Sequence, residues 1–213
     1  GDHQGAGETQ PVPHCHQNLG EAEALVHAFM YMRLLGYPRE RIALLTPDSG
    51  QKALLRDVVA HRCCATAAQR AAYGRPAHIA TVDQAQGVRT DYVLLSLVRT
   101  DSAPGRLADA RRLAVALTRA TRGLYIFCRA ERFTTCPETA PALAKLAETC
   151  GTRLVLCPAE RFGKCERRAD EPVASCGGGV EIGSLRELAQ LVMDLYTAQH
   201  KGEEGQAAEK KNE

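Results

Sequence analysis

The feature that most constrains the fold of this 213-residue chain is a series of short, almost wholly apolar runs. Segments with helical spacing separate them, and we expect a strand at each run: Ile42–Leu45, His78–Val82, Tyr92–Val98 and Leu124–Cys128. Strands that are apolar at every position are covered on both faces, which is typical of a parallel sheet with crossover helices. The sequence therefore predicts an α/β fold with a mainly parallel sheet.

Apolar residues spaced three and four apart predict the helices that connect these strands. We expect helices at Gly20–Leu35, Gln51–Arg62, Asp109–Ala120 and Pro141–Glu148, and a further strand at Arg153–Leu156. Ser184 and Glu187 form a capping box, so a last helix is predicted to begin there and to run to about His200.

Composition divides the chain into five parts. Residues 1–17 are rich in Gly, Pro, Gln and His without apolar periodicity, so we predict a disordered linker. The α/β domain then covers residues 18–156, and a loop-rich extension with Pro and Gly covers 157–183. A C-terminal helix covers 184–200, and residues 201–213, which lack large apolar side chains, are predicted to be a disordered tail.

Composition also argues against some kinds of site. No run of about 18 apolar residues is present, so no membrane span is predicted. The nine cysteines are irregularly spaced without a CxxC pair, so we expect no metal site and reduced thiols. The net charge of +2, from 27 basic and 25 acidic residues, does not argue for a nucleic-acid partner.

Charge is distributed unevenly, however. Residues 86–133 contain nine Arg, no Lys and four acidic residues. An excess of planar, permanently charged guanidinium groups is typical of a phosphate-binding surface. A solvated basic face explains the charge equally well, so both interpretations stay open on charge alone.

Ligands of parallel α/β folds sit at the carboxyl ends of the strands, which directs attention to three loops. Residues 46–51, 83–91 and 99–112 follow predicted strands and carry the unusual side chains. In the second loop, Gly87 lets the backbone approach a ligand closely, and Gln86 offers both a donor and an acceptor. In the helix after the third loop, Arg112, Val115 and Arg119 are three and four apart, so we expect them on one face. A plain surface helix rich in Arg is the structural alternative.

Several strings resemble the motifs of superfamily 1 helicases. TVDQAQGVRTDYVLLSLVRT (81–100) and RRLAVALTRA (111–120) are similar to motifs V and VI, and LLTPDSGQ (44–51) is similar to motif IV. Together with NLGEAEALVHAFMYMRLLGYP (18–38), they resemble the Aquarius-type intron-binding splicing helicases in particular. The resemblance covers about residues 18–200. It implies the second RecA-like domain of such a helicase, a three-layer sandwich of the P-loop NTPase fold that lacks the P-loop itself.

The resemblance also implies roles for single residues. Arg119 is the expected arginine finger, whose charge would neutralise the γ-phosphate of ATP. The expected ATP-binding residues are Gln51, Asp83, Gln86, Gly87 and Arg89. The expected RNA-binding residues are Thr81, Arg99 and Thr100. Magnesium would be supplied through the first RecA-like domain.

Some positions depart from the family pattern. Asp48 stands where the family commonly has a Tyr that stacks on adenine, and Arg89 stands where many members have Glu. No G-x-x-x-x-G-K-[ST] is present, because Gly163-Lys164 is followed by Cys165. The pair Asp170-Glu171 does not follow an apolar strand, so it is no Walker B motif. We therefore expect neither ATP hydrolysis nor helicase activity from this segment alone.

Two functions follow from the resemblance. The first is the second motor domain of an ATP-dependent RNA helicase in pre-mRNA splicing, acting in the nucleus with RNA, a first RecA-like domain of the same or another chain, and spliceosomal proteins. The alternative is an RNA-binding scaffold module of a spliceosomal complex, with weakened catalysis. The motif residues Arg119, Gln86 and Asp83 favour the motor, whereas Asp48 and Arg89 favour the scaffold. A purely structural remnant is a third option.

Overall fold

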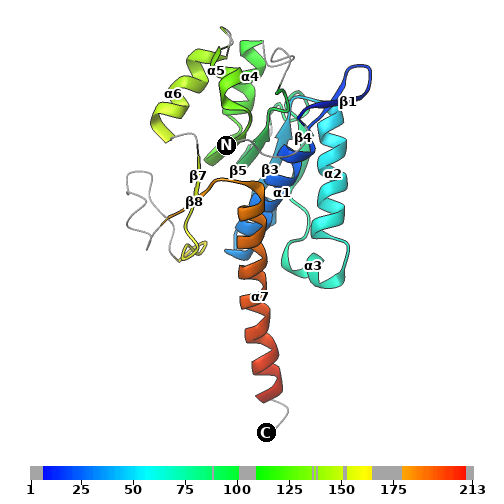
Figure 1. Ribbon diagram of the computed structural model, residues 1–213, viewed down its shortest axis with the longest axis vertical. Coiled ribbons are helices and arrows are strands. Elements are labelled where there is room, and N and C mark those ends of the chain that lie inside the picture. The colour runs from blue at the N-terminus through cyan, green and yellow to red at the C-terminus, as the bar shows by residue number, and fades with distance from the viewer. Residues whose placement is uncertain are drawn as a thin grey trace.

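The computed structural model describes residues 7–87, 89–100, 109–135, 137, 139–150, 153–164 and 179–209. Its centre is a parallel sheet of four strands in the order β4-β3-β5-β6 (Figure 1). Their bounds are Ile42–Thr46 for β3, His78–Thr81 for β4, Thr90–Ser96 for β5 and Ala120–Phe127 for β6. The prediction of an α/β fold with a mainly parallel sheet is confirmed.

The sheet is buried on both faces because alternate side chains of its central strands enter two separate cores. Ile42 and Leu44 of β3 belong to one core, and Ala43 and Leu45 belong to the other. β5 alternates in the same way. Successive residues of a strand point to opposite faces, so an unbroken apolar run supplies both cores at once.

Four helices accompany the first core. They are α1 (Leu19–Leu34), α2 (Ser49–Cys63), α3 (Ala67–Ala72) and α7 (Leu185–Glu209). Asn18 caps α1, where its side chain accepts a hydrogen bond from the Glu21 amide. The side chains of Leu25 and Phe29 are fully buried against the sheet side of α1. Leu188 and Val192 bring the first half of α7 into the same core, and α7 then extends away from the domain as a single helix (Figure 1).

Three helices accompany the second core: α4 (Ala110–Leu117), α5 (Ala130–Thr135) and α6 (Ala140–Cys150). Ala116 of α4 is fully buried against the sheet. The predicted helix Asp109–Ala120 is wrong at its end, because α4 stops at Leu117 and Ala120 already pairs with Thr90 of β5. Pairing with β5 thus takes the last residues of the helical pattern into β6.

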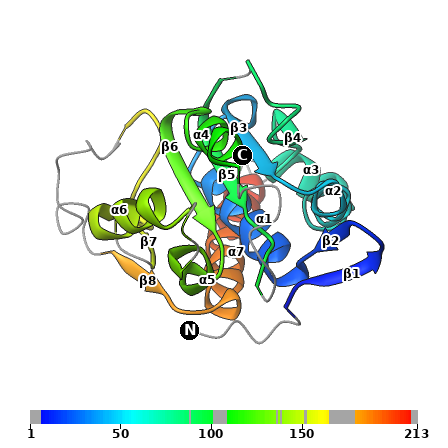
Figure 2. The same ribbon diagram turned by 90° about the horizontal axis from the view of Figure 1, so that it is seen from above.

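Residues 9–17, which composition placed in a disordered linker, contain two strands. β1 (Thr9–Val12) and β2 (Cys15–Gln17) form an antiparallel hairpin beside α2, across the molecule from the ribbon of β7 (Leu154–Leu156) and β8 (Val180–Ile182) (Figure 2). Gly50 permits this packing, because a Cβ there would lie 2.5 Å from the Cys15 Sγ atom. A contact between such distant residues leaves no local signal in the sequence.

Two other predicted boundaries also change. The loop-rich extension 157–183 closes with strand β8, and its residues 165–178 lie outside the described part of the chain. The last helix does not end near His200 but continues to Glu209, so the predicted tail is helical through residue 209. Among the described residues, no helix has the length and apolar character that a membrane crossing needs.

Candidate nucleotide and nucleic-acid site

A hollow of about 230 Å³ lies at the carboxyl end of β4, between the loop that follows this strand and helix α4. It is lined by Val82, Asp83, Gln86, Arg111, Arg112 and Val115. The Nε atom of Arg112 lies 3.3 Å from a carboxylate oxygen of Asp83, and the two side chains are 39% and 41% exposed. The structure thus brings two of the predicted nucleotide-binding residues, Asp83 and Gln86, together with two arginines.

The loop that forms this hollow depends on Gly87. Its φ of +84° is a left-handed conformation that side chains disfavour, although a Cβ there would meet nothing within 4 Å. The glycine is therefore required by the backbone, while the space beside it stays open. Ala85 anchors the same loop in the second core, and Arg89, which follows, is exposed.

Arg119 lies in the connection between α4 and β6, so it does not share a helical face with Arg112 as predicted. Its Nε atom donates to the Val115 carbonyl at 3.0 Å, and a terminal amino group donates to the Thr118 hydroxyl at 3.2 Å. Within the described part of the chain, no carboxylate forms an ion pair with this guanidinium. Its positive charge is thus held by neutral oxygens and is not cancelled by an acid.

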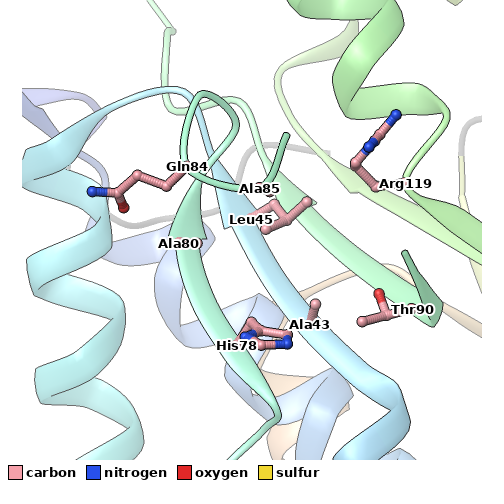
Figure 3. A pocket seen from close by; sticks show the side chains of 8 residues that line it. All are labelled: Ala43, Leu45, His78, Ala80, Gln84, Ala85, Thr90 and Arg119. Atoms are coloured by element: carbon pink, nitrogen blue, oxygen red, sulfur yellow. The ribbon is translucent and has the colours of Figure 1, made fainter. Parts of the chain in front are cut away.

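Arg119 also lines a second, smaller pocket of about 40 Å³ over the sheet, with Leu45, Ala80 and Thr90 among its walls (Figure 3). In this view its side chain points in the direction in which β3 and β4 run, toward their carboxyl ends, whereas Gln84 points away to the other side (Figure 3). Val115 lines the larger hollow and its carbonyl holds Arg119, so the last turns of α4 connect the two pockets. Arginines 111, 112 and 119 outnumber Asp83, so the residues that line the two pockets carry a net positive charge.

The prediction that Gln51 contacts a nucleotide is not supported by its position. Gln51 is fully buried in the first turns of α2. Its amide oxygen accepts from the Asn18 amide at 2.8 Å, and its amide nitrogen donates to the Asn18 carbonyl at 3.0 Å and to the Ser96 hydroxyl at 3.1 Å. The side chain holds the start of α1 against the end of β5, a structural role that uses its hydrogen-bonding groups internally.

The predicted RNA-binding residues are covered in this arrangement. Arg99 has a side chain only 12% exposed, between the carboxylates of Glu8 at 3.4 Å and Asp48 at 3.9 Å. Thr100 is also buried, and its amide donates to Glu8 at 2.8 Å. Asp48, where the helicase motif commonly has an aromatic ring, is thus buried beside Arg99.

Thr81, the third predicted RNA-binding residue, is buried at the end of β4. Its hydroxyl accepts a long hydrogen bond of 3.4 Å from the Gln84 amide, and its own amide donates to the Gln84 side chain at the same distance. The residue therefore caps the turn that begins the loop. An RNA contact through any of these three residues remains a prediction that requires a local rearrangement.

The segment after β5 is held in a strained conformation. Val98 has a φ of +71°, which is a rare state for a β-branched residue. Its amide donates to the Glu21 carboxylate at 2.8 Å, and its carbonyl accepts from the Asn18 side chain at 3.2 Å. The first turn of α1 thus fixes the direction in which Arg99 leaves the sheet.

Burial raises the pKa of Glu21 to about 7, against the opposing effect of hydrogen bonds from Ser96 and Val98. The negative charge of Glu8 raises this pKa further.

Elsewhere, burial raises the pKa of the Cys63 and Cys128 thiols to about 12, so both resist conversion to reactive thiolates. In the described ranges, no group of three or more His, Cys, Asp and Glu side chains gathers as metal ligands.

The sequence analysis placed Glu8 in a linker and assigned no role to Glu21. Neither has a local signal, because their partners lie about 75 to 92 residues away at 96, 98 and 100. Arg112 was visible as a member of an arginine-rich helix, but its pairing with Asp83 was not.

Comparison with known proteins identifies the family of this chain. A family profile described as an AAA domain matches residues 2–131, which is more than half of the chain. The chain belongs to this AAA domain family. The strings of this chain that resemble helicase motifs V and VI lie on the loop after β4 and on α4, the two walls of the hollow.

Relatives of this chain include an RNA helicase and a pre-mRNA-splicing factor. The chain is 43% identical to RNA helicase aquarius of Mus musculus over 195 residues, covering 92% of this chain and 13% of the relative. It is 33% identical to pre-mRNA-splicing factor cwf11 of Schizosaccharomyces pombe over 199 residues, covering 92% of this chain and 14% of the relative. The chain therefore spans about an eighth of the length of these relatives.

A third relative is the regulator of nonsense transcripts 1 homologue of Arabidopsis thaliana, 37% identical over 106 residues, which covers 49% of this chain and 8% of the relative. Together with the family match, these similarities confirm the predicted resemblance to the C-terminal domain of an Aquarius-type superfamily 1 helicase. The parallel sheet with helices on both faces agrees with the RecA-like fold of this AAA domain family.

Proposed function

We propose that this domain is the second motor domain of an ATP-dependent RNA helicase that acts in pre-mRNA splicing. The observation that carries the proposal is the arginine-lined hollow at the carboxyl end of β4, with Arg119 beside it, whose guanidinium donates to the Val115 carbonyl and the Thr118 hydroxyl. Ligands of parallel α/β sheets bind at this edge, and guanidinium groups bind phosphate. The names of two relatives, a helicase and a splicing factor, support the same proposal.

In the proposed mechanism, the γ-phosphate of ATP approaches the hollow from a first RecA-like domain, which also supplies the P-loop and magnesium. Arg119 would neutralise charge on the phosphate as it is transferred, an effect worth roughly 10³ to 10⁵ in rate in nucleotide hydrolases. Arg112 and Gln86 line the hollow together with Val115, and they would hold the remaining phosphate oxygens. Gly87 keeps the loop open to the nucleotide.

The RNA-binding part of the proposal concerns Arg99 and Thr100 at the end of β5. Glu8 covers both residues, so an RNA contact there requires Glu8 to move. The burial of Gln51 and Asp48 favours the second candidate function, an RNA-binding scaffold module whose catalysis is weakened, because it removes two positions from nucleotide contact. Partners in either case would be RNA, a first RecA-like domain and spliceosomal proteins, in the nucleus.

An exchange experiment separates the two functions. Residues 1–213 replace the matching segment of mouse aquarius, and the exchange protein is assayed for RNA binding and for RNA-stimulated ATP hydrolysis. The unaltered mouse protein is the positive control, and the isolated 213-residue chain is expected to hydrolyse no ATP. Hydrolysis by the exchange protein supports the motor, RNA binding without hydrolysis supports the scaffold, and loss of both in a folded protein contradicts the proposal.

A further inference from the structure

The N-terminal segment places a carboxylate directly on the strained turn after β5. One oxygen of Glu8 accepts from the Thr100 amide at 2.8 Å, and the other lies 3.4 Å from an Arg99 amino group. The amide of Glu8 also donates to the Thr100 hydroxyl at 2.9 Å, and the carboxylate lies 3.6 Å from the His16 ring. Arg99, Glu8 and His16 have side chains that are only 12% to 15% exposed.

The groups that hold this carboxylate are those that hold a phosphate in other proteins. A guanidinium and a backbone amide that donate hydrogen bonds to the same anion form a charge-assisted anion site. The site lies at the carboxyl end of β5, the edge of a parallel sheet at which ligands bind. Because Val98 is fixed by Glu21 and Asn18, the direction of the Arg99–Thr100 segment does not depend on Glu8.

We propose that Arg99 and the Thr100 amide form an anion site that Glu8 occupies in this state, and that a backbone phosphate of RNA takes the place of Glu8 when the hairpin β1–β2 moves aside. The choice of RNA as the ligand rests on the proposed function, whereas the existence of the anion site does not. A phosphodiester carries one negative charge, as the carboxylate does, so the exchange leaves the charge balance with the neighbouring Asp48 unchanged.

The hairpin is built in a way that allows it to move. A two-stranded hairpin is marginally stable alone, and every residue of β1 is exposed, including Val12 at 55%. The hairpin contacts α2 through a hydrogen bond of 3.1 Å from the Gln17 side chain to the Gly50 carbonyl and through Cys15, which packs beside Gly50. Segments with few buried apolar contacts open at low cost, so a multivalent RNA strand is able to compete with the tethered carboxylate.

Removal of the Glu8 charge tests the competition. Glu8→Gln in the full 213-residue chain keeps an oxygen for the Thr100 amide but weakens the hold on Arg99. Glu40→Gln is the matched control, because it removes the same charge from an exposed carboxylate just before β3, at the opposite end of the sheet. Affinity for a fluorescent single-stranded oligouridine is measured by anisotropy at several salt concentrations, and urea unfolding checks that each variant is folded.

We expect Glu8→Gln to bind the oligouridine about tenfold more tightly than Glu40→Gln, with a salt dependence steeper by about 0.7 for one added phosphate contact. Adding Arg99→Gln to Glu8→Gln is expected to remove both effects. Equal affinities of Glu8→Gln and Glu40→Gln would overturn the proposal, and so would a gain that survives the loss of Arg99. The same binding measurement with ATP in place of RNA shows whether the phosphate that occupies the site belongs to a nucleotide or to RNA.

Inorganic phosphate separates the site from the proposed RNA function. In the Glu8→Gln variant, phosphate is expected to shift the NMR signal of the Arg99 Nε–H group, whereas the wild-type signal stays in place. If no variant binds RNA but phosphate shifts this signal, the anion site stands and the RNA-binding function fails. If phosphate leaves the signal unchanged in both proteins, the anion site itself is wrong.

Discussion

The carboxylate of Glu21 makes the stability of this domain fall as the pH rises from about 4.5 to about 7. Its pKa rises from 4.5 in the unfolded chain to about 7 in the folded domain, mainly because burial disfavours the charged form. Folding therefore favours the protonated acid. The stabilisation is fully present below about pH 4.5, declines between 4.5 and 7, and is lost above the folded pKa, with a limit of about 3 kcal/mol.

Urea unfolding of the wild type and of Glu21→Gln at several pH values measures this effect. Gln is neutral at every pH and keeps an oxygen for the Ser96 and Val98 donors, so its profile lacks this decline. We expect the stability of Glu21→Gln relative to wild type to increase by about 2 kcal/mol from about pH 5 to about pH 8. Glu40→Gln serves as the control, because it leaves Glu21 in place and should retain the decline. Parallel profiles of wild type and Glu21→Gln would refute the reasoning.

Three further predictions concern single contacts. Gln51→Ala leaves the buried groups of Asn18 and Ser96 without partners, so urea unfolding should show a loss of about 3 kcal/mol, whereas a loss below about 1 kcal/mol would contradict the structural role. Arg112→Ala breaks a half-exposed pair, so stability should change by less than about 1 kcal/mol while ATP hydrolysis by the exchange protein falls about a hundredfold; unchanged hydrolysis would remove Arg112 from the site. Gly50→Ala introduces a Cβ 2.5 Å from Cys15 Sγ, so amide exchange in residues 9–17 should accelerate, and unaltered exchange would show that the hairpin does not depend on this contact.

The parts of the fold that sequence analysis predicted are those with a local physical cause. The run Ile42–Leu45 is apolar on both faces and became the central strand β3, buried at every position. The apolar spacing within residues 20–35 predicted α1, and the observed start at Leu19 lies one residue before the predicted Gly20. Gly87 was predicted to let the backbone approach a ligand; the structure shows a left-handed φ of +84° there, and the ligand contact stays a prediction.

The features that were not predicted have causes far away in the chain. The helical pattern of 109–120 is continuous in sequence, but pairing of Ala120 with Thr90 ends the helix early and moves Arg119 into a connection. Gln51 follows a strand and opens a helix, as a ligand-binding residue would, yet Asn18 and Ser96 use its amide. Motif patterns identify the edge of the sheet that binds ligands, but they do not tell which polar side chains there are already bound internally.

The central claim is that Arg119 acts on a phosphate bound at the carboxyl end of the sheet. Single-turnover ATP hydrolysis by the exchange protein, with RNA present, tests it through Arg119→Ala. The control is Arg153→Ala, which removes an exposed arginine paired with Glu181 on the distant β7–β8 ribbon. We expect the rate of ATP hydrolysis to fall by a factor of about 10³ or more in Arg119→Ala and to stay unchanged in Arg153→Ala. Equal rates for the two variants would contradict it.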